Sequence, residues 1–251
     1  MKERLSQRLA DVQLALALLT RLPLPGRALP DRGAGAAWAW PLAGIAVGGL
    51  AALVAGTAQA LGLPAGIAAA LALGGQALAT GAMHEDGLAD TADGLWGGWT
   101  RERRLEIMKD SRSGSYGVAA LVLVTLLRWT ALAAVLEAGG WALPLAVAVL
   151  SRVPMVVLMA WLPNARGAGL SQSLGRPDLR QALTAAGVGL GVALAVAGGP
   201  GLAMAGAAGA AALALGLVAR AKIGGQTGDI LGASQQLSEA AALVAAAALI
   251  G

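Results

Sequence analysis

The stretch YGVAALVLVTLLRWTALAAVLEA, residues 116–138, has only two charged residues, Arg128 and Glu137. A helix of about 20 mainly apolar residues crosses the roughly 30 Å hydrocarbon core of a bilayer. This stretch therefore predicts a transmembrane helix. Other apolar segments of sufficient length lie at 38–61, 65–83, 141–162, 181–198, 201–219 and 230–250. Together they predict an all-α, polytopic integral membrane bundle of about seven transmembrane helices.

The composition supports this class. Of the 251 residues, 57% are hydrophobic and 13% are charged, which is not the balance of an ordinary soluble domain. No polar stretch is long enough for a second soluble core, so residues 1–251 are predicted to form one integral membrane catalytic domain. The absence of cysteine excludes disulfides, thiolate metal sites and a cysteine nucleophile.

The positions of the basic residues predict the topology. Of the 18 lysines and arginines, 16 lie in four segments: 1–37, 84–115, 163–180 and 220–222. These segments alternate with the connections 61–64, 139–140 and 198–201, which have no basic residue. The positive-inside rule then predicts that the N-terminus and all four basic segments are cytoplasmic and that the C-terminus is outside.

Two short amphipathic helices are predicted at the membrane interface. In the first 37 residues, Leu5, Leu9, Val12, Leu16 and Leu19 recur at helical spacing beside charged residues. The competing interpretation is a cleaved signal peptide, but the apolar run is short and no small-residue cleavage site follows it. A second short helix is predicted over residues 101–109.

An acidic cluster, HEDGLADTADG at residues 84–94, directly follows the second apolar segment. On a helix, Asp86, Asp90 and Asp93 lie within an arc of about 60°. Three such carboxylates repel one another unless a cation shares them, and their hard oxygen atoms favour magnesium or calcium. This predicts a metal site suited to chemistry on a diphosphate.

The competing interpretation of this cluster is a solvated, charged helix end. Against it, no lysine or arginine is interleaved with the aspartates, and several glycines allow close approach of a backbone or a ligand. His84 lies about 160° around an ideal helix from Asp86. It is therefore not expected to bind the same metal ion, and it remains a candidate for capping or for supporting the substrate.

Three motifs carry a resemblance to a known family. They are HEDGLADTADG at 84–94, LEIMKDSRSGSYG at 105–117 and GGQTGDILGA at 224–233. With LTRLPLP at 19–25 and NARGAGLS at 164–171, they make the chain resemble the cobalamin synthase family over nearly its whole length. Members of that family complete the nucleotide loop of cobalamin.

The resemblance implies a reaction, a cofactor and a location. The reaction is transfer of the cobinamide phosphate of adenosylcobinamide-GDP to α-ribazole or its 5'-phosphate, with release of GMP. It implies Mg²⁺ as cofactor, held by Asp86, Asp90 and Asp93, and a location in the bacterial inner membrane with the active site facing the cytoplasm. A homo-oligomer or a complex with other corrinoid-pathway enzymes is compatible with it, and no nucleic-acid partner is expected.

Asp229 has two interpretations. Thr227 is placed to cap the last helix and Asp229 falls in its first turn, where the helix dipole favours an acidic residue. Alternatively, Asp229 is a fourth catalytic or metal-binding carboxylate, because the topology places it on the same side as the acidic cluster. The resemblance favours this second role and makes Thr227 a candidate substrate contact.

Candidate phosphate contacts lie in two polar segments. Ser111 and Arg112 open the third apolar segment, where backbone N–H groups and a guanidinium suit a phosphate. Arg166 has the same potential, and the competing interpretation for each is an ordinary cytoplasmic loop. Arg128 and Arg152 fall within apolar segments, and two roles are open for them: to bind substrate phosphate, or to hold the bundle by pairing with an acidic residue. A structural or cavity-lining role is expected for both.

Two other functions would also use acidic residues in a membrane protein. A membrane phosphotransferase of the CDP-alcohol type also has aspartates on a helix, but its spacing of glycine and aspartates is not matched here, where Ala89 precedes Asp90. A cation-coupled transporter is disfavoured because the acidic cluster lies at the end of a span, whereas transport sites lie near the bilayer midplane.

Overall fold

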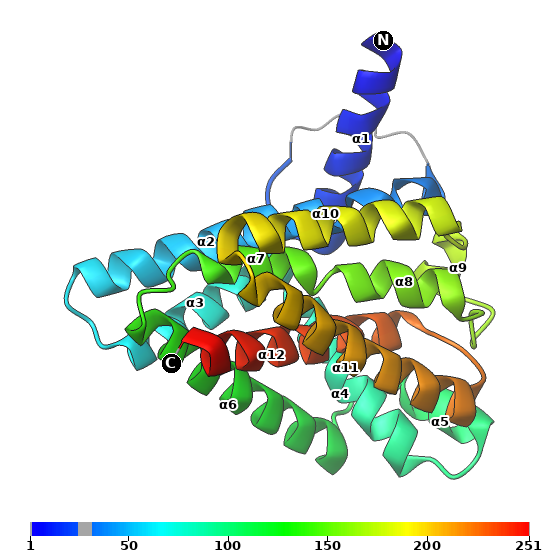
Figure 1. Cartoon of the computed structure of the whole chain (residues 1–251). Coiled ribbons are helices and arrows are strands. Elements are labelled where there is room, and N and C mark those ends of the chain that lie inside the picture. The colour runs from blue at the N-terminus through cyan, green and yellow to red at the C-terminus, as the bar shows by residue number, and fades with distance from the viewer. Residues whose placement is uncertain (1, 25–31, 251) are drawn as a thin grey trace.

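The computed structural model describes residues 2–24 and 32–250, which form a helical bundle (Figure 1). Pro25 of the LTRLPLP motif, Arg27 of the first basic segment and Gly251 lie outside the described residues. The helices of the first half are α1 (Lys2–Leu19), the 3-10 helix η1 (Gly33–Ala39), α2 (Trp40–Ala60), α3 (Ala65–Thr80), α4 (Met83–Gly97), α5 (Arg101–Ile107) and α6 (Ser115–Glu137). Those of the second half are α7 (Leu143–Leu150), α8 (Val153–Trp161), α9 (Leu170–Leu174), α10 (Leu179–Ala197), α11 (Pro200–Ile223) and α12 (Gly228–Ile250).

Five segments are long and apolar enough to cross a membrane, or six if one bent helix pair counts as a span. The five are Gly33–Ala60, Ser115–Glu137, Leu143–Trp161, Leu179–Ala197 and Pro200–Ile223. Helix α12 has sufficient length, but its first half carries buried polar side chains that lower its hydropathy. The all-helical bundle with several helices of membrane-spanning length and hydropathy is confirmed. The predicted spans at 65–83 and 230–250 are not among these five segments.

The predicted span at 65–83 ends early. Helix α3 stops at Thr80, and α4 begins at Met83 after a bend of 89°. Gly81 and Ala82 both have positive φ, and this left-handed backbone conformation separates α3 from α4. Since α4 carries His84, Glu85 and three aspartates beyond this bend, we treat it as lying outside the spanning segments.

The predicted span at 141–162 is one segment broken into two helices. Helix α7 ends at Leu150 and α8 begins at Val153, with Ser151 and Arg152 between them. Pro154 has no N–H to donate to Leu150, so an unbroken helical hydrogen-bond pattern is impossible here. The break exposes backbone carbonyl groups inside the bundle, where Arg152 uses one of them.

The connections between helices collect at two ends of the bundle. Figure 1 shows residues 61–64, 139–142 and 198–199 toward the end that holds the C-terminus. Helix α5, helix α9 and the connection from α11 to α12 lie at the opposite end. The basic segments 84–115, 163–180 and 220–222 therefore share one end, as the predicted alternation requires.

Both predicted short helices are present. Helix α5 (Arg101–Ile107) is capped by Thr100, whose hydroxyl accepts the Arg103 N–H. Helix α1 projects from the bundle in Figure 1, and its buried side is formed by Asp11, Ala15 and Leu19. Leu5 and Leu9, at 61% and 59% exposure, have no place in this contact. The expected apolar stripe of α1 thus packs onto the protein only in its C-terminal half.

Candidate active site

The candidate site lies where α4 crosses α12 (Figure 1). A Cβ atom on Gly87 would stand 3.0 Å from the Asp229 carbonyl oxygen and 3.2 Å from the Gly232 Cα. The absence of a side chain at Gly87 therefore allows the two backbones to meet. This crossing brings the acidic residues of α4 to the first turn of α12, which carries Asp229.

The three aspartates of the acidic cluster do lie on one helix, α4, although it is a new helix and not a continuation of α3. Burial, followed by the negative charges of Asp86, Asp229 and Asp93, raises the pKa of Asp90 to about 7. Arg166 opposes this shift. The four predicted catalytic carboxylates are thus close enough to repel one another, and a single guanidinium only partly offsets their charge.

Asp93 has a partner that its spacing did not reveal. Its two carboxylate oxygens accept hydrogen bonds from the Gly114 and Gly117 N–H groups, at 2.7 and 2.9 Å. These N–H groups are at the start of α6, which otherwise lacks a side-chain cap. Asp93 therefore fixes the α6 N-terminus against α4 by the favourable interaction of a carboxylate with a helix start.

Arg166 reaches Asp229 through two paired loops. Asn164 and Gln226 form an isolated parallel bridge. In it, the Ala165 N–H donates to the Gln226 carbonyl oxygen and the Gln226 backbone N–H donates to the Pro163 carbonyl oxygen. The pairing places the Arg166 Nη2 2.7 Å from the Asp229 Oδ2. The NARGAGLS and GGQTGDILGA motifs, far apart in sequence, are therefore parts of one site.

The Thr227–Asp229 turn caps α12 and also makes contacts beyond a cap. The Thr227 hydroxyl accepts the Ile230 N–H at 3.3 Å, as a helix cap does. Asp229 is not simply a capping residue, because its carboxylate is bound by Arg166 and also accepts the Thr227 hydroxyl at 3.2 Å. Thr227 is buried, so its contribution is to hold Asp229 in place.

A cavity of about 230 Å³ opens beside this crossing. Asp86, Arg166 and Asp229 line it, and so does His84. The remaining wall comes from α1, α2, α4, α8, α9, α12 and the segment before α9, and it is mainly apolar. His84 thus shares a cavity with Asp86 despite its position on another side of the helix.

Ser111 and Arg112 are placed differently from the other predicted contacts. Arg112 is 87% exposed and forms an ion pair with Asp110 at 2.8 Å. Its hydrogen bonds to the Asp110 carboxylate lower the pKa of Asp110 to about 2. Ser111 is also exposed, and neither residue lines the cavity. Their segment is linked to the acidic cluster by the hydrogen bond from the Gly114 N–H to the Asp93 carboxylate.

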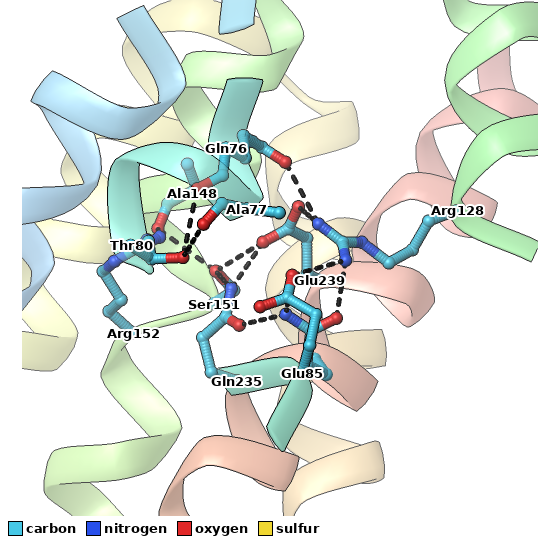
Figure 2. A network of polar contacts seen from close by, with 11 residues as sticks. Gln76, Ala77, Thr80, Glu85, Arg128, Ala148, Ser151, Arg152, Gln235 and Glu239 are labelled. Atoms are coloured by element: carbon cyan, nitrogen blue, oxygen red, sulfur yellow. Dashed lines mark hydrogen bonds and ion pairs between the residues drawn. The ribbon is translucent and has the colours of Figure 1, made fainter. Parts of the chain in front are cut away.

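Arg128 and Arg152 enter a buried polar network, as Figure 2 shows. Arg128 pairs with Glu239 at 2.7 Å and with Glu85 at 3.4 Å, which confirms the expected acidic partner. Arg152 donates to the Ala148 carbonyl oxygen, which the break between α7 and α8 leaves available. Further amide and hydroxyl contacts come from Gln76, Ser151, Gln235 and Gln236.

Three basic residues of the segments 84–115 and 220–222 have backbone partners that the sequence did not reveal. Arg101 and Arg104 donate to the Ile223 and Lys222 carbonyl oxygens at the end of α11, both at 2.9 Å. Lys222 donates to the Leu95 carbonyl oxygen at 2.7 Å. Cations at helix C-termini are stabilising, so these residues hold α4, α5 and α11 together beside the site.

The donor set is compatible with a magnesium ion. In the described part of the chain, no three His, Asp or Glu side chains converge as a complete metal-binding group. Magnesium does not require one, because it retains several waters and usually takes one or two carboxylates together with substrate phosphates. The four carboxylates supply the negative charge that such an ion would balance, and the ion would relieve their mutual repulsion.

The chain resembles characterised sequences over almost its full length. The family described as Cobalamin-5-phosphate synthase matches residues 11–247. An adenosylcobinamide-GDP ribazoletransferase of Bradyrhizobium diazoefficiens is 47% identical over 249 residues, covering 96% of this chain and 94% of that protein. A protein of the same name from Mesorhizobium japonicum is 44% identical, covering 96% of this chain and 93% of its own. No solved structure matches the chain. With its motifs joined in one site and this extent of similarity, the chain belongs to the Cobalamin-5-phosphate synthase family.

Proposed function

We propose that this protein transfers the cobinamide phosphate of adenosylcobinamide-GDP to α-ribazole or α-ribazole 5'-phosphate and releases GMP. Family membership supports the reaction class. The observation that carries the proposal is the cavity into which Asp86, Asp229 and Arg166 converge from three separate motifs. Carboxylates and a guanidinium around a cavity are the groups that phosphoryl transfer requires.

Magnesium is the cofactor in this proposal. Asp86 and Asp90 would hold it, Asp229 would serve the nucleophile, and Asp93 is engaged with the α6 N-terminus. When bound, the ion supplies charge neutralisation for the diphosphate and for the GMP leaving group. Removal of divalent ions with EDTA should therefore abolish turnover, and added magnesium should restore it.

The chain's own residues would position the reacting groups. The ribose hydroxyl of ribazole attacks the phosphorus nearer to cobinamide, and the bond from this phosphorus to the oxygen of GMP breaks. Asp229 accepts the hydroxyl proton, since it comes from a different helix than the other carboxylates and is held by Arg166 and Thr227. The buried Arg166 Nε has no hydrogen-bond partner, so it retains a donor for a phosphate oxygen.

We also propose a seven-span arrangement in the bacterial inner membrane, with the N-terminus and the site on the cytoplasmic side. The spans are α2, α3, α6, the broken pair α7 and α8, α10, α11 and α12. This assignment is supported by the shared end of the basic segments and by the positive-inside rule. A cysteine at exposed Ser113 should react with an impermeant reagent from the cytoplasmic side, and one at exposed Gly139 from the outside. Labelling of both from the same side would contradict it.

The test of the function is incubation of the purified protein with adenosylcobinamide-GDP, α-ribazole and magnesium. Mass spectrometry should detect the cobalamin product and GMP in equal amounts, and only when the acceptor is present. Conversion of a CDP-activated lipid without any reaction of the corrinoid would instead assign the protein to the rival phosphotransferase type.

A further inference from the structure

The cavity beside the α4–α12 crossing has two chemically different parts. One part is charged and is formed by Asp86, Asp229 and Arg166. The other part is mainly apolar and comes from six helices, α1, α2, α4, α8, α9 and α12. Its apolar side chains include Leu18, Trp40, Met83, Met155, Leu174 and Leu231. A ligand that fills the whole cavity must therefore combine an apolar body with a polar group at one end.

Two polar side chains, His84 and Ser171, line the mainly apolar part, and the Ser171 hydroxyl already accepts a hydrogen bond from Asn164 Nδ2. The His84 side chain is 1% exposed, and its Nε2 atom has no hydrogen-bond partner. A buried polar atom without a partner is unfavourable by roughly 1–3 kcal/mol, and such atoms are uncommon in folded proteins. Since His84 lines the cavity, a bound ligand is the natural source of the missing partner.

We propose that the apolar part of the cavity binds the heterocyclic base of the ribazole acceptor, and that His84 Nε2–H donates a hydrogen bond to the unsubstituted ring nitrogen of that base. The identity of the ligand rests on the proposed function. A base in this position extends its ribose toward Asp86 and Asp229, where the hydroxyl must react. His84 then selects the acceptor and does not itself take part in the transfer.

The other parts of the substrates fit this cavity less well. Guanine has donors and acceptors along most of its edge, and an apolar wall would leave them without partners. The corrin ring is far larger than a cavity of about 230 Å³. A benzimidazole base has two apolar faces and one free ring nitrogen, which matches a mainly apolar wall with one unpartnered polar atom, His84 Nε2.

The experiment compares two acceptors that differ by one atom. Benzimidazole α-riboside has the free ring nitrogen, and indole α-riboside has a C–H group in its place. Equilibrium binding of each to the purified full chain, with magnesium and without adenosylcobinamide-GDP, should show roughly tenfold tighter binding of the benzimidazole compound. The transfer reaction with each acceptor is measured separately.

Variants of α4 assign this preference to His84. His84→Leu should bind both ribosides within about twofold of each other, whereas His84→Gln, which retains an N–H donor, should recover part of the preference. Thr91→Val is the matched control. Thr91 is on the same helix and its buried hydroxyl also has no partner, but it does not line the cavity. This control should keep the full preference.

The outcomes separate the two proposals. Equal binding of both ribosides by a wild-type protein that catalyses the transfer would overturn the base site and leave the proposed function intact. A nitrogen preference that persists in His84→Leu would also overturn it. A preference that depends on His84 in a protein without transferase activity would support the base site and refute the proposed function.

Discussion

Helices α4 and α12 meet in two regions that use charge in opposite ways. In the first, the acidic site, Asp86 and Asp90 of α4 approach Asp229 of α12 and have one guanidinium, that of Arg166, beside them. In the second, the buried network, Glu85 of α4 and Glu239 of α12 surround Arg128 (Figure 2). Glu85 and Asp86 are adjacent on α4, whereas Asp229 lies in the first turn of α12 and Glu239 lies near its middle.

The balance of charge distinguishes structure from function here. The network sets two carboxylates, those of Glu85 and Glu239, around the Arg128 guanidinium, and Arg152 donates to the Ala148 carbonyl oxygen. Each of these carboxylates has a cationic partner, and the pair with Glu85 holds α4 on the bundle. The acidic site has an excess of carboxylates, so we expect a cation or a substrate to complete it. Glu85 and Asp86 belong to different regions because adjacent side chains on a helix diverge by about 100°.

The largest effect is expected from removing one charge of the acidic site. Asp90→Asn keeps the shape of the side chain but leaves a much poorer magnesium ligand. Turnover should fall on the order of 10³-fold, while the protein inserts, purifies and unfolds on heating no earlier than wild type. Steady-state kinetics and a thermal melt in detergent measure both properties. Wild-type turnover in this variant would refute the carboxylate mechanism.

Asp229→Asn separates metal binding from proton transfer. Asp86→Asn should weaken binding of magnesium in the absence of substrate, because it removes a ligand. Asp229→Asn should lose activity with a smaller change in that affinity if the residue chiefly serves the nucleophile. Titration calorimetry on both variants makes the comparison. Full activity of Asp229→Asn would reduce Asp229 to a helix-start residue and leave the α4 carboxylates as the site.

The buried network should respond in the opposite manner. Arg128→Met leaves Glu239 buried without its closest ion-pair partner, which is expected to lower the free energy of unfolding by about 3–5 kcal/mol. The double variant Arg128→Met/Glu239→Gln should recover part of this loss, because the more deeply buried of the two unpaired carboxylates is then neutral. Unfolding by heat or denaturant in detergent is the measurement.

The control for this loss is Arg112→Met, which breaks an exposed ion pair with Asp110. It should change stability by less than about 1 kcal/mol. If Arg128→Met were as stable as this control yet inactive, the network would belong to the active site and the contrast between the two regions would fail.

The sequence predicted the acidic site better than it predicted the network. The aspartate spacing on α4 depends only on local helix geometry, and the apolar segments and basic residues were sufficient for a helical membrane bundle. Arg128 and Arg152 require partners within apolar segments, but no local pattern identified Glu85 and Glu239 for Arg128 or the Ala148 carbonyl oxygen for Arg152. The pairing of Arg128 depends on how α4, α6 and α12 pack, which no local pattern encodes.

Other features depended on backbone geometry. The expected second span ends at the bend formed by Gly81 and Ala82, and a new helix, α4, begins after it. Neither residue interrupts the apolar pattern of the sequence strongly. Asp93 was grouped with the metal ligands by its spacing, whereas its bonds to Gly114 and Gly117 come from a loop of another motif. The shared LEIMKDSRSGSYG motif was the available signal that this loop belongs near the site.

The smallest predicted effect tests the burial of Asp90 together with the repulsion from its neighbouring carboxylates. The pKa of Asp90 is raised from 3.8 to about 7, so between these pH values the folded protein retains a proton that the unfolded chain has released. Stability contributed by this group is therefore present at low pH and is lost as the pH rises toward 7. In EDTA, the wild-type Tm should decline over this interval by at most about 3 °C more than that of Asp90→Asn, since the residue is partly exposed to screening solvent. Magnesium at pH 7.5 should remove the difference, because a bound cation replaces the proton in relieving the repulsion. Parallel pH profiles for the two proteins in EDTA would show that the carboxylates do not repel one another, and the acidic site would then be as balanced as the buried network.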